Sequence, residues 1–208
     1  HPTLRRQRQM CIRDSAGTYN GNGTAWMVKN IRSGSSPSYP TSFTAVGNTL
    51  YFAAQDGTNG QELWKSDGTA SGTVMVKDIN SGSTSSGLAD LTAVGNTLYF
   101  VASDGTNGPE LWKSDGTASG TVMVKDINSG SGGGSLGYLT AVGNTLYFRA
   151  NEGTNGVELW KSDGTESGTM MVKNIRSSGS GSSYPIYLTA VGNTLYFQAN
   201  GCQVDGIT

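Results

Sequence analysis

The chain has 208 residues and a formal net charge of −1, with 14% charged residues, 31 glycines and 5 prolines. Charged residues are scarce compared with about 25% in typical soluble domains, and the glycine share is roughly double the usual one. The longest apolar runs, such as residues 98–102, are far too short for a membrane span. The sequence therefore predicts a soluble, turn-rich chain that does not insert into a membrane.

Histidine and cysteine are nearly absent from the sequence. His1 is the only histidine, and Cys11 and Cys202 are the only cysteines. A Ser-His-Asp or Cys-His nucleophile needs an imidazole base, and zinc sites need clusters of His or Cys. Two cysteines in a chain of this length make no disulfide framework. We therefore predict no catalytic residue, no metal-ligating residue and no cofactor.

Residues 1–15 differ in charge from the rest of the chain. They hold four arginines and one aspartate, a net charge of +3, which leaves −4 for residues 16–208. The stretch RRQRQMCIRDS resembles translated sequencing-adapter read-through and has no apolar signal-peptide core. We predict that residues 1–15 are a non-native or disordered basic tail. The acidic remainder disfavours binding to a phosphate backbone, so we expect no nucleic-acid partner.

Two octapeptides recur along residues 16–200. AVGNTLYF begins at Ala45, Ala93, Ala141 and Ala190. ELWKSDGT begins at Glu62, Glu110 and Glu158. Spacings of 48 or 49 residues indicate a tandem repeat. The last copy has no ELW segment, so residues 201–208 are a truncated or divergent end, with 202–207 as a candidate for the missing strand.

Each copy has the pattern of four short strands, which we describe for the second copy. The predicted strands cover residues 91–94, 97–102, 110–114 and 121–127. Gly95-Asn96 has the composition of a two-residue hairpin turn, in which glycine adopts a positive φ.

Apolar residues fall on both faces of the predicted strands. In the fourth strand, Val122 and Val124 are expected on one face, and Met123 and Ile127 on the other. A sheet that is apolar on both faces packs between neighbours. Four strands in 48 residues are typical of a propeller blade, so we predict an all-β fold, a β-propeller or incomplete propeller of about four four-stranded blades. A β-helix is the alternative, but its shorter coil period is not visible.

The repeated ELWKSDGT segments, with Gly72-Thr73 and the MVKDI stretch downstream, resemble the bacterial ELWxxDGT-repeat family. The resemblance covers residues 16–200. It implies a tandem, propeller-like repeat in large secreted or surface-associated proteins, and hence an extracellular or cell-surface location. It implies no established activity, cofactor or active-site residue. The first copy departs from the pattern, with Ser15-Ala16-Gly17-Thr18 where Ser-Asp-Gly-Thr is expected.

The repeated aromatic residues have two interpretations, sugar-stacking platforms or packing between blades. The tryptophans are Trp64, Trp112 and Trp160, and the tyrosines are Tyr51, Tyr99, Tyr147 and Tyr196. Each set occupies one position on a predicted strand. Large aromatic side chains dominate packing of this kind, so we predict that both sets pack between blades.

The repeated glutamates are candidates for a glycosidase acid and base. They are Glu62, Glu110 and Glu158. Such a pair must face one bond across a cleft, about 5 to 9.5 Å apart. Identical carboxylates, one in each blade, have nothing to separate their pKa values. The spacing therefore disfavours catalysis.

The acidic turns are candidates for calcium sites. The residues at one such turn are Asp56, Asp104 and Glu152. Calcium prefers oxygen-rich loops, but the alternating Asp-x-Asp-x-Asp-Gly spacing is absent. We favour plain Asp-Gly turns, with calcium as the alternative. At the second turn we expect hydrogen bonds to the turn backbone from Asp67, Asp115 and Asp163.

The segments between copies vary while the strands barely change. They cover residues 32–42, 80–90, 128–138 and 176–187, and are rich in Ser and Gly. Tyrosine among Ser and Gly is typical of adaptable recognition loops, although a flexible connection between blades has the same composition. The candidate binding residues are Tyr39, Tyr138, Tyr184 and Tyr187.

We therefore expect a non-catalytic extracellular or cell-surface interaction or display module that binds carbohydrate or protein through these loops. Its partners are a glycan or a surface protein. One alternative is a propeller-type polysaccharide hydrolase or lyase. Another is a purely structural spacer.

Overall fold

A computed structural model of the protein describes residues 27–176 and 181–207, with side chains as far as Gly201. The described residues form fifteen strands and no helix. The first sheet contains β1 (Thr41–Val46), β2 (Thr49–Ala54), β3 (Glu62–Ser66) and β4 (Val74–Lys77). The second contains β5 (Ala89–Val94), β6 (Thr97–Ala102), β7 (Glu110–Ser114) and β8 (Val122–Lys125). The third contains β9 (Gly137–Val142), β10 (Thr145–Asn151), β11 (Val157–Ser162) and β12 (Met170–Lys173), and the fourth contains β13 (Ile186–Val191), β14 (Thr194–Ala199) and β15 (Cys202–Ile207).

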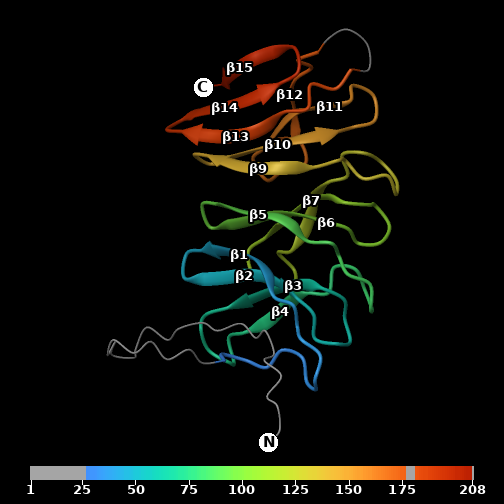
Figure 1. Ribbon diagram of the computed structural model, residues 1–208, viewed down its shortest axis with the longest axis vertical. Coiled ribbons are helices and arrows are strands. Elements are labelled where there is room, and N and C mark those ends of the chain that lie inside the picture. The colour runs from blue at the N-terminus through green and yellow to red at the C-terminus, as the bar shows by residue number, and fades with distance from the viewer. Residues whose placement is uncertain (1–26, 177–180, 208) are drawn as a thin grey trace, which may run out of the picture.

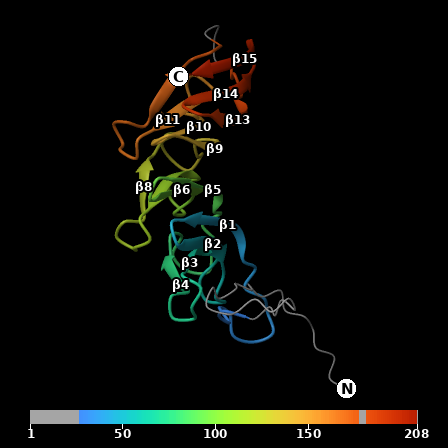
Figure 2. The ribbon, with the colours of Figure 1, turned by 90° about the vertical axis from the view of Figure 1, so that its left-hand side faces the viewer.

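The four sheets stack along the long axis of the molecule (Figure 1). Within each sheet the strands follow chain order and every pair is antiparallel. Neighbouring sheets contact each other through their first strands, β1 with β5, β5 with β9, and β9 with β13. Figure 2 shows these first strands on one side of the stack and β4 and β8 on the other. The all-β prediction is confirmed, with small antiparallel sheets, and the described residues form no closed ring.

The hairpins between first and second strands form as the sequence predicts. In the second sheet Val94 pairs with Thr97 across Gly95-Asn96, and Gly95 has φ +58°. Glycine tolerates this conformation without steric cost, and a positive φ at the first turn residue matches a type II′ hairpin.

The fourth strand of the second sheet is shorter than predicted. β8 ends at Lys125, and the Ile127 N–H donates to the Glu110 Oε2 atom at 3.0 Å. Ile127 packs with Val124 between the second and third sheets, whereas Met123 packs between the first and second. The prediction that Ile127 shares a face with Met123 is therefore wrong, because the chain leaves the strand before Ile127.

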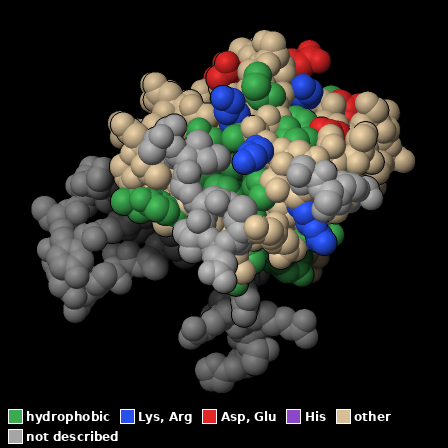
Figure 3. Space-filling model, turned by 90° about the horizontal axis from the view of Figure 1, so that it is seen from above, with side chains coloured by type: hydrophobic (Ala, Val, Ile, Leu, Met, Phe, Trp, Pro, Cys, Tyr) green, Lys and Arg blue, Asp and Glu red, His purple; other side chains and the backbone are tan. Residues whose placement is uncertain are grey.

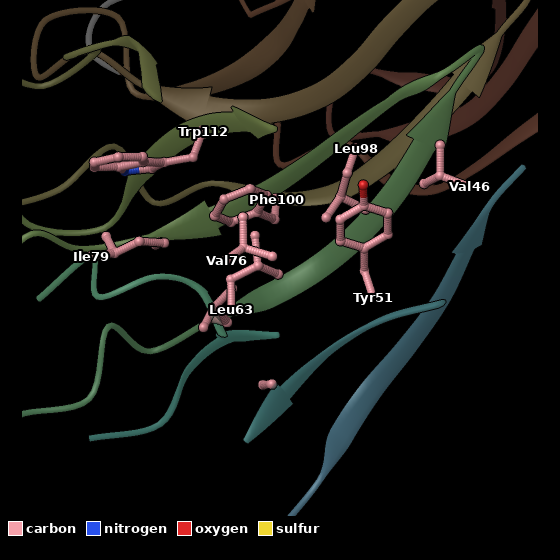
Figure 4. Close-up of a cluster of buried hydrophobic side chains, with 11 residues drawn as sticks. Val46, Tyr51, Leu63, Val76, Ile79, Leu98, Phe100 and Trp112 are labelled. Atoms are coloured by element: carbon pink, nitrogen blue, oxygen red, sulfur yellow. The ribbon is translucent and has the colours of Figure 1, made fainter. Parts of the chain in front are cut away.

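The core consists of apolar layers between successive sheets. Figure 4 shows the layer between the first and second sheets. The first sheet and the segment after it contribute Val46, Tyr51, Ala53, Leu63, Val76 and Ile79, and the second contributes Leu98, Phe100, Ala102 and Trp112. A fully buried Leu or Phe side chain stabilises the fold by roughly 1.5–3 kcal/mol. Each sheet therefore depends on its neighbours, as the pattern on both faces predicts.

Lysine side chains also join the sheets. The Lys65 ammonium donates to the carbonyl of Gly116 at 2.8 Å, across the joint between the first two sheets. Lys77 donates to the carbonyl of Thr121 at 2.8 Å, and its ammonium lies 5.8 Å from the centre of the Trp112 ring. The same bonds recur one repeat later. These lysines fix the register between sheets, because each reaches one particular turn of its neighbour.

The fourth sheet ends the stack. Residues 202–207 pair with β14 as β15, which confirms them as the missing third strand. Val191 is 60% exposed, whereas its three equivalents, Val46, Val94 and Val142, are at most 9% exposed. Tyr196 is also exposed, because no described sheet packs on this face of the fourth sheet. The prediction that Tyr196 packs between blades is therefore wrong. Figure 3 looks onto this end and shows hydrophobic side chains at the surface, near Lys and Arg.

The joint between the first two sheets gives a matched pair of glycine substitutions. Gly116 has φ +89°, and a Cβ there would come 2.4 Å from the Tyr51 hydroxyl. Gly68 has φ +92° with nothing within 4 Å of such a Cβ. Both alanine variants lose about 1–2 kcal/mol from the positive φ. We expect Gly116→Ala to lose roughly 1–3 kcal/mol more from overpacking, as measured by urea unfolding.

Tyr51→Phe is the control for that substitution, because it removes the hydroxyl group and leaves the ring in place. The double variant Tyr51→Phe with Gly116→Ala recovers most of the additional loss. Equal losses of unfolding free energy for Gly68→Ala and Gly116→Ala would contradict the close contact between Gly116 and Tyr51.

Candidate functional site

The glutamates of the ELW segments are completely buried. Glu62 Oε2 accepts the Ile79 N–H at 2.9 Å, and Glu62 Oε1 accepts the Ser86 N–H at 2.9 Å. Glu158 makes the same pair of bonds to Ile175 and Ser183. Each carboxylate thus ties the segment after the fourth strand to the segment that enters the next sheet.

Burial raises the pKa of the Glu62 and Glu110 carboxyls, and the nearby Asp78 and Asp126 carboxylates add to this effect. The pKa of Glu110 rises to about 7. Gly134 stands beside Glu110 where the first copy has Ser86, so Glu110 lacks a hydroxyl donor. The raised pKa of Glu110 is therefore a property of a completely buried carboxyl that binds backbone N–H groups.

The acidic turns use their carboxylates for their own backbone. Asp56 Oδ1 accepts the N–H groups of Thr58 and Asn59 at 2.8 Å, and Asp56 Oδ2 accepts the Asn59 amide at 2.9 Å. At the second turn, the Thr69 hydroxyl and N–H donate to Asp67, which lowers the pKa of Asp67. Asp115 and Asp163 repeat these bonds, which confirms the prediction for this turn.

At the first turn these internal bonds engage both oxygens of Asp56, and at the second turn they engage Oδ1 of Asp67. Within residues 27–176 and 181–201, no three His, Cys, Asp or Glu side chains are placed to share a metal ion.

The repeated tryptophans lie inside the stack. Trp64, Trp112 and Trp160 are all buried in the apolar layers, and each Nε1 atom lacks a hydrogen-bond partner within the described residues. The predicted packing between sheets is confirmed for Trp112 and Trp160, whereas Trp64 packs with Phe52 and Ile31 on the other face of the first sheet. A buried ring offers no face to a sugar, which leaves the segments between copies as candidates.

All four candidate tyrosines lie at the surface. Tyr39, Tyr138, Tyr184 and Tyr187 are between 40% and 68% exposed. Tyr39 and Tyr184 precede the first strands of the first and fourth sheets, three joints apart, so the fold does not bring them together. Tyr138 and Tyr187 occupy equivalent positions in β9 and β13, which lie side by side.

The backbone at these four tyrosines is left-handed. Their φ values lie between +46° and +59°. Every copy has two such positions, three residues apart, and the second lies at a bulge in the first strand. The second position holds Ser42, Asp90, Tyr138 and Tyr187. The scaffold therefore imposes this conformation whatever the side chain.

The segments between copies are held in place before each bulge. The Ser103 N–H donates to the Ser86 carbonyl at 2.8 Å, and the Ser86 N–H is bound by the buried Glu62. The bonds between Asn200 and Ser183 repeat this arrangement. Tyr39 and Tyr184 thus follow directly after a residue whose carbonyl is bound, Ser38 and Ser183 respectively.

Two residues that the sequence analysis did not single out, Arg149 and Asp90, contact the candidate tyrosine Tyr138. The guanidinium carbon of Arg149 lies 4.6 Å from the centre of the Tyr138 ring. Asp90 Oδ2 accepts the Tyr138 N–H at 2.8 Å from the neighbouring strand. The sequence does set Arg149 apart, because it is the one charged residue at this repeat position. The equivalent positions hold Ala53, Val101 and Gln198.

Comparisons with known proteins give no family. No protein-family model matches the chain, and no curated protein matches it. Among the described residues, no helix is long and apolar enough to cross a membrane.

The buried glutamates predict an unusual pH dependence of stability. Folding raises the pKa of Glu110 from 4.5 to about 7, so between these pH values the native state holds a proton that the unfolded chain releases. We expect the free energy of unfolding to fall as the pH rises from 5 to 8. Residues 27–201 contain no histidine or cysteine to obscure this trend. Urea midpoints at pH 5 and pH 8 measure it.

Gly134→Ser is the matched variant for the pH experiment. Its Cβ would lie 3.2 Å from Glu110 Oε2, where a hydroxyl can donate, and the mobile tip of Leu136 must move aside. We expect this variant to lower the pKa of Glu110 and to flatten the pH dependence. A wild-type midpoint that rises between pH 5 and pH 8 would contradict the assignment.

The left-handed tyrosines predict an inverted response to glycine. Tyr187→Gly relieves a conformation that costs an L-residue about 1–2 kcal/mol, partly offset by the flexibility of glycine in the unfolded chain. We expect the free energy of unfolding to stay level or to rise by up to about 1 kcal/mol.

Tyr196→Gly is the control for this prediction. Tyr196 is also exposed but lies within β14 with no positive φ, so glycine there lowers stability by about 0.5–1 kcal/mol. If Tyr187→Gly and Tyr196→Gly lower the free energy of unfolding equally, the backbone at Tyr187 is not strained.

Proposed function

We propose that this chain is a non-catalytic interaction or display module that binds glycan or protein through its exposed tyrosines. The observation that carries the proposal is the combination of exposure and left-handed backbone at Tyr39, Tyr138, Tyr184 and Tyr187. Glycine suits such a backbone best, and Gly87 occupies one of these positions. Four tyrosines at an energetic cost, with little packing in return, indicate selection for what the side chains contact.

The sheet arrangement supports a propeller-like scaffold for this module. First strands meet along one side of the stack while β4 and β8 lie on the other, as blades do around an axis (Figure 2). We propose that the four sheets are an arc of such a propeller. The resemblance to the ELWxxDGT-repeat family supports an extracellular or cell-surface location.

The alternative of a polysaccharide hydrolase or lyase has less support. Its candidate acid and base were the repeated glutamates, and each is buried with its oxygen atoms bound to backbone N–H groups. A glycosidic oxygen cannot reach a carboxyl group in that position. A purely structural spacer explains the stack, but it gives no reason for strained tyrosines at the surface.

The test is a screen of the full chain against a broad glycan and protein panel, followed by substitution. Tyr138→Ser and Tyr187→Ser introduce the residue that the first copy carries at Ser42, so the scaffold tolerates both. We expect each to weaken binding of a ligand found in the screen by at least about tenfold, since loss of an aromatic anchor typically exceeds 1 kcal/mol.

Tyr196→Ser is the control, because it removes an exposed tyrosine from a strand outside this set. Glycan turnover that is lost on Glu110→Gln would support the enzyme instead. A panel that yields no ligand would support the spacer.

A further inference from the structure

We propose that Arg149, stacked on Tyr138, is a binding subsite for a carboxylate, and that its ligand is a glycan that contains a uronic acid. This inference rests on the proposed binding function and narrows it to one ligand class. It assigns the site to the third copy, at its boundary with the fourth, where the sequence departs from the other repeats.

No described carboxylate forms an ion pair with the guanidinium of Arg149. Within the described residues Arg149 donates no hydrogen bond, and its Nε atom is buried without a partner. Most described lysines donate to backbone carbonyls of a neighbouring sheet or turn. An arginine presents five N–H donors in a planar fork that matches a carboxylate.

The Tyr138 ring holds that fork in one orientation. The guanidinium carbon lies 4.6 Å from the ring centre, within the range of a cation–π contact. Arg149 also pairs with Gly137 across the strands, so no side chain opposes it. The donors are therefore held in place before a ligand arrives, which lowers the entropic cost of binding.

The surroundings of Arg149 suit a sugar ring that carries one carboxylate. Asp90 is exposed, and its Oδ1 atom has no hydrogen bond within the described chain, so it can accept a sugar hydroxyl. Tyr187, 68% exposed, occupies the next position along the ladder of first strands and offers an aromatic face to sugar C–H groups. Carboxylate, hydroxyls and an apolar ring face occur together in a uronic acid.

An acidic peptide fits the same site less well. Its glutamate side chains carry no hydroxyl group that could donate to the Asp90 Oδ1 atom. The site has one arginine and one aspartate, so it matches one negative charge accompanied by hydroxyl donors. A run of acidic side chains supplies one carboxylate per residue, as a uronic acid does, but no hydroxyl donors beside it.

The experiment is a titration of the full chain with trigalacturonate, in which NMR or calorimetry measures binding. Two further probes are its fully methyl-esterified form, which keeps the rings and removes the charge, and a tri-glutamate peptide. We expect trigalacturonate to bind at least about tenfold more tightly than the ester, because a charge-assisted hydrogen bond is worth more than a neutral one. We also expect that affinity to fall with added salt.

Arg149→Gln is the test variant, because the fourth copy already carries Gln198 at this position and the fold accepts it. We expect it to lose the preference for the acid over the ester. Arg32→Gln is the control, since it makes the same change in net charge in the segment before the first sheet.

The outcomes separate the two proposals. If the acid and the ester bind equally and Arg149→Gln changes neither, the tyrosines bind glycans and the carboxylate subsite is wrong. Tighter binding of tri-glutamate than of trigalacturonate also overturns the subsite in favour of a protein partner. If the chain binds no glycan in this test or in the panel, the glycan function itself fails.

Discussion

Burial of apolar side chains between successive sheets is the constraint on which the structure depends. A four-stranded sheet of about twenty strand residues cannot bury Trp, Phe and Leu side chains by itself, and each layer of the core is shared by two copies. The lysines that bind turn carbonyls of the next sheet then fix how the layers meet. Stability is thus a property of neighbouring copies rather than of one copy. The exposed Val191 shows the same rule at the end of the stack.

The buried glutamate connects this core to the surface. Each carboxylate is desolvated, and its partners are backbone N–H groups of the segment that leads into the next sheet. The chain then passes through one left-handed residue before the first strand and a second at the bulge near the start of that strand. The variable side chains at these residues therefore project from a rigid backbone. In the segment between the first two sheets, the Glu62 carboxylate binds the backbone at Ile79 and again at Ser86.

Much of the fold was predictable from the sequence because the repeat shows the same pattern several times. The hairpin at Gly95-Asn96, the strand at residues 97–102 and the packing of Trp112 all follow from local pattern and repetition. The end of the fourth strand did not follow, because Ile127 is drawn out of the strand by a hydrogen bond to Glu110, 17 residues earlier. The exposure of Tyr196 depends on the absence of a covering sheet, which a repeat-equivalent position does not reveal.

The candidate site was predictable only in part. Composition pointed to Tyr39, Tyr138, Tyr184 and Tyr187, and the structure adds their exposure and their backbone conformation. Arg149 and Asp90 were missed because they approach Tyr138 from a neighbouring strand and a neighbouring sheet. Residues that lie far apart in the sequence meet here through strand register, and register between sheets is set by three-dimensional contacts.

A crystal structure of the full chain, at a resolution that defines each backbone torsion, tests the central claim most directly. The claim is that a fixed scaffold holds strained tyrosines at the surface. The account predicts positive φ at Tyr39, Tyr138, Tyr184 and Tyr187, with all four rings exposed and the repeated glutamates buried. Negative φ at these tyrosines, or rings packed between the sheets, would contradict it.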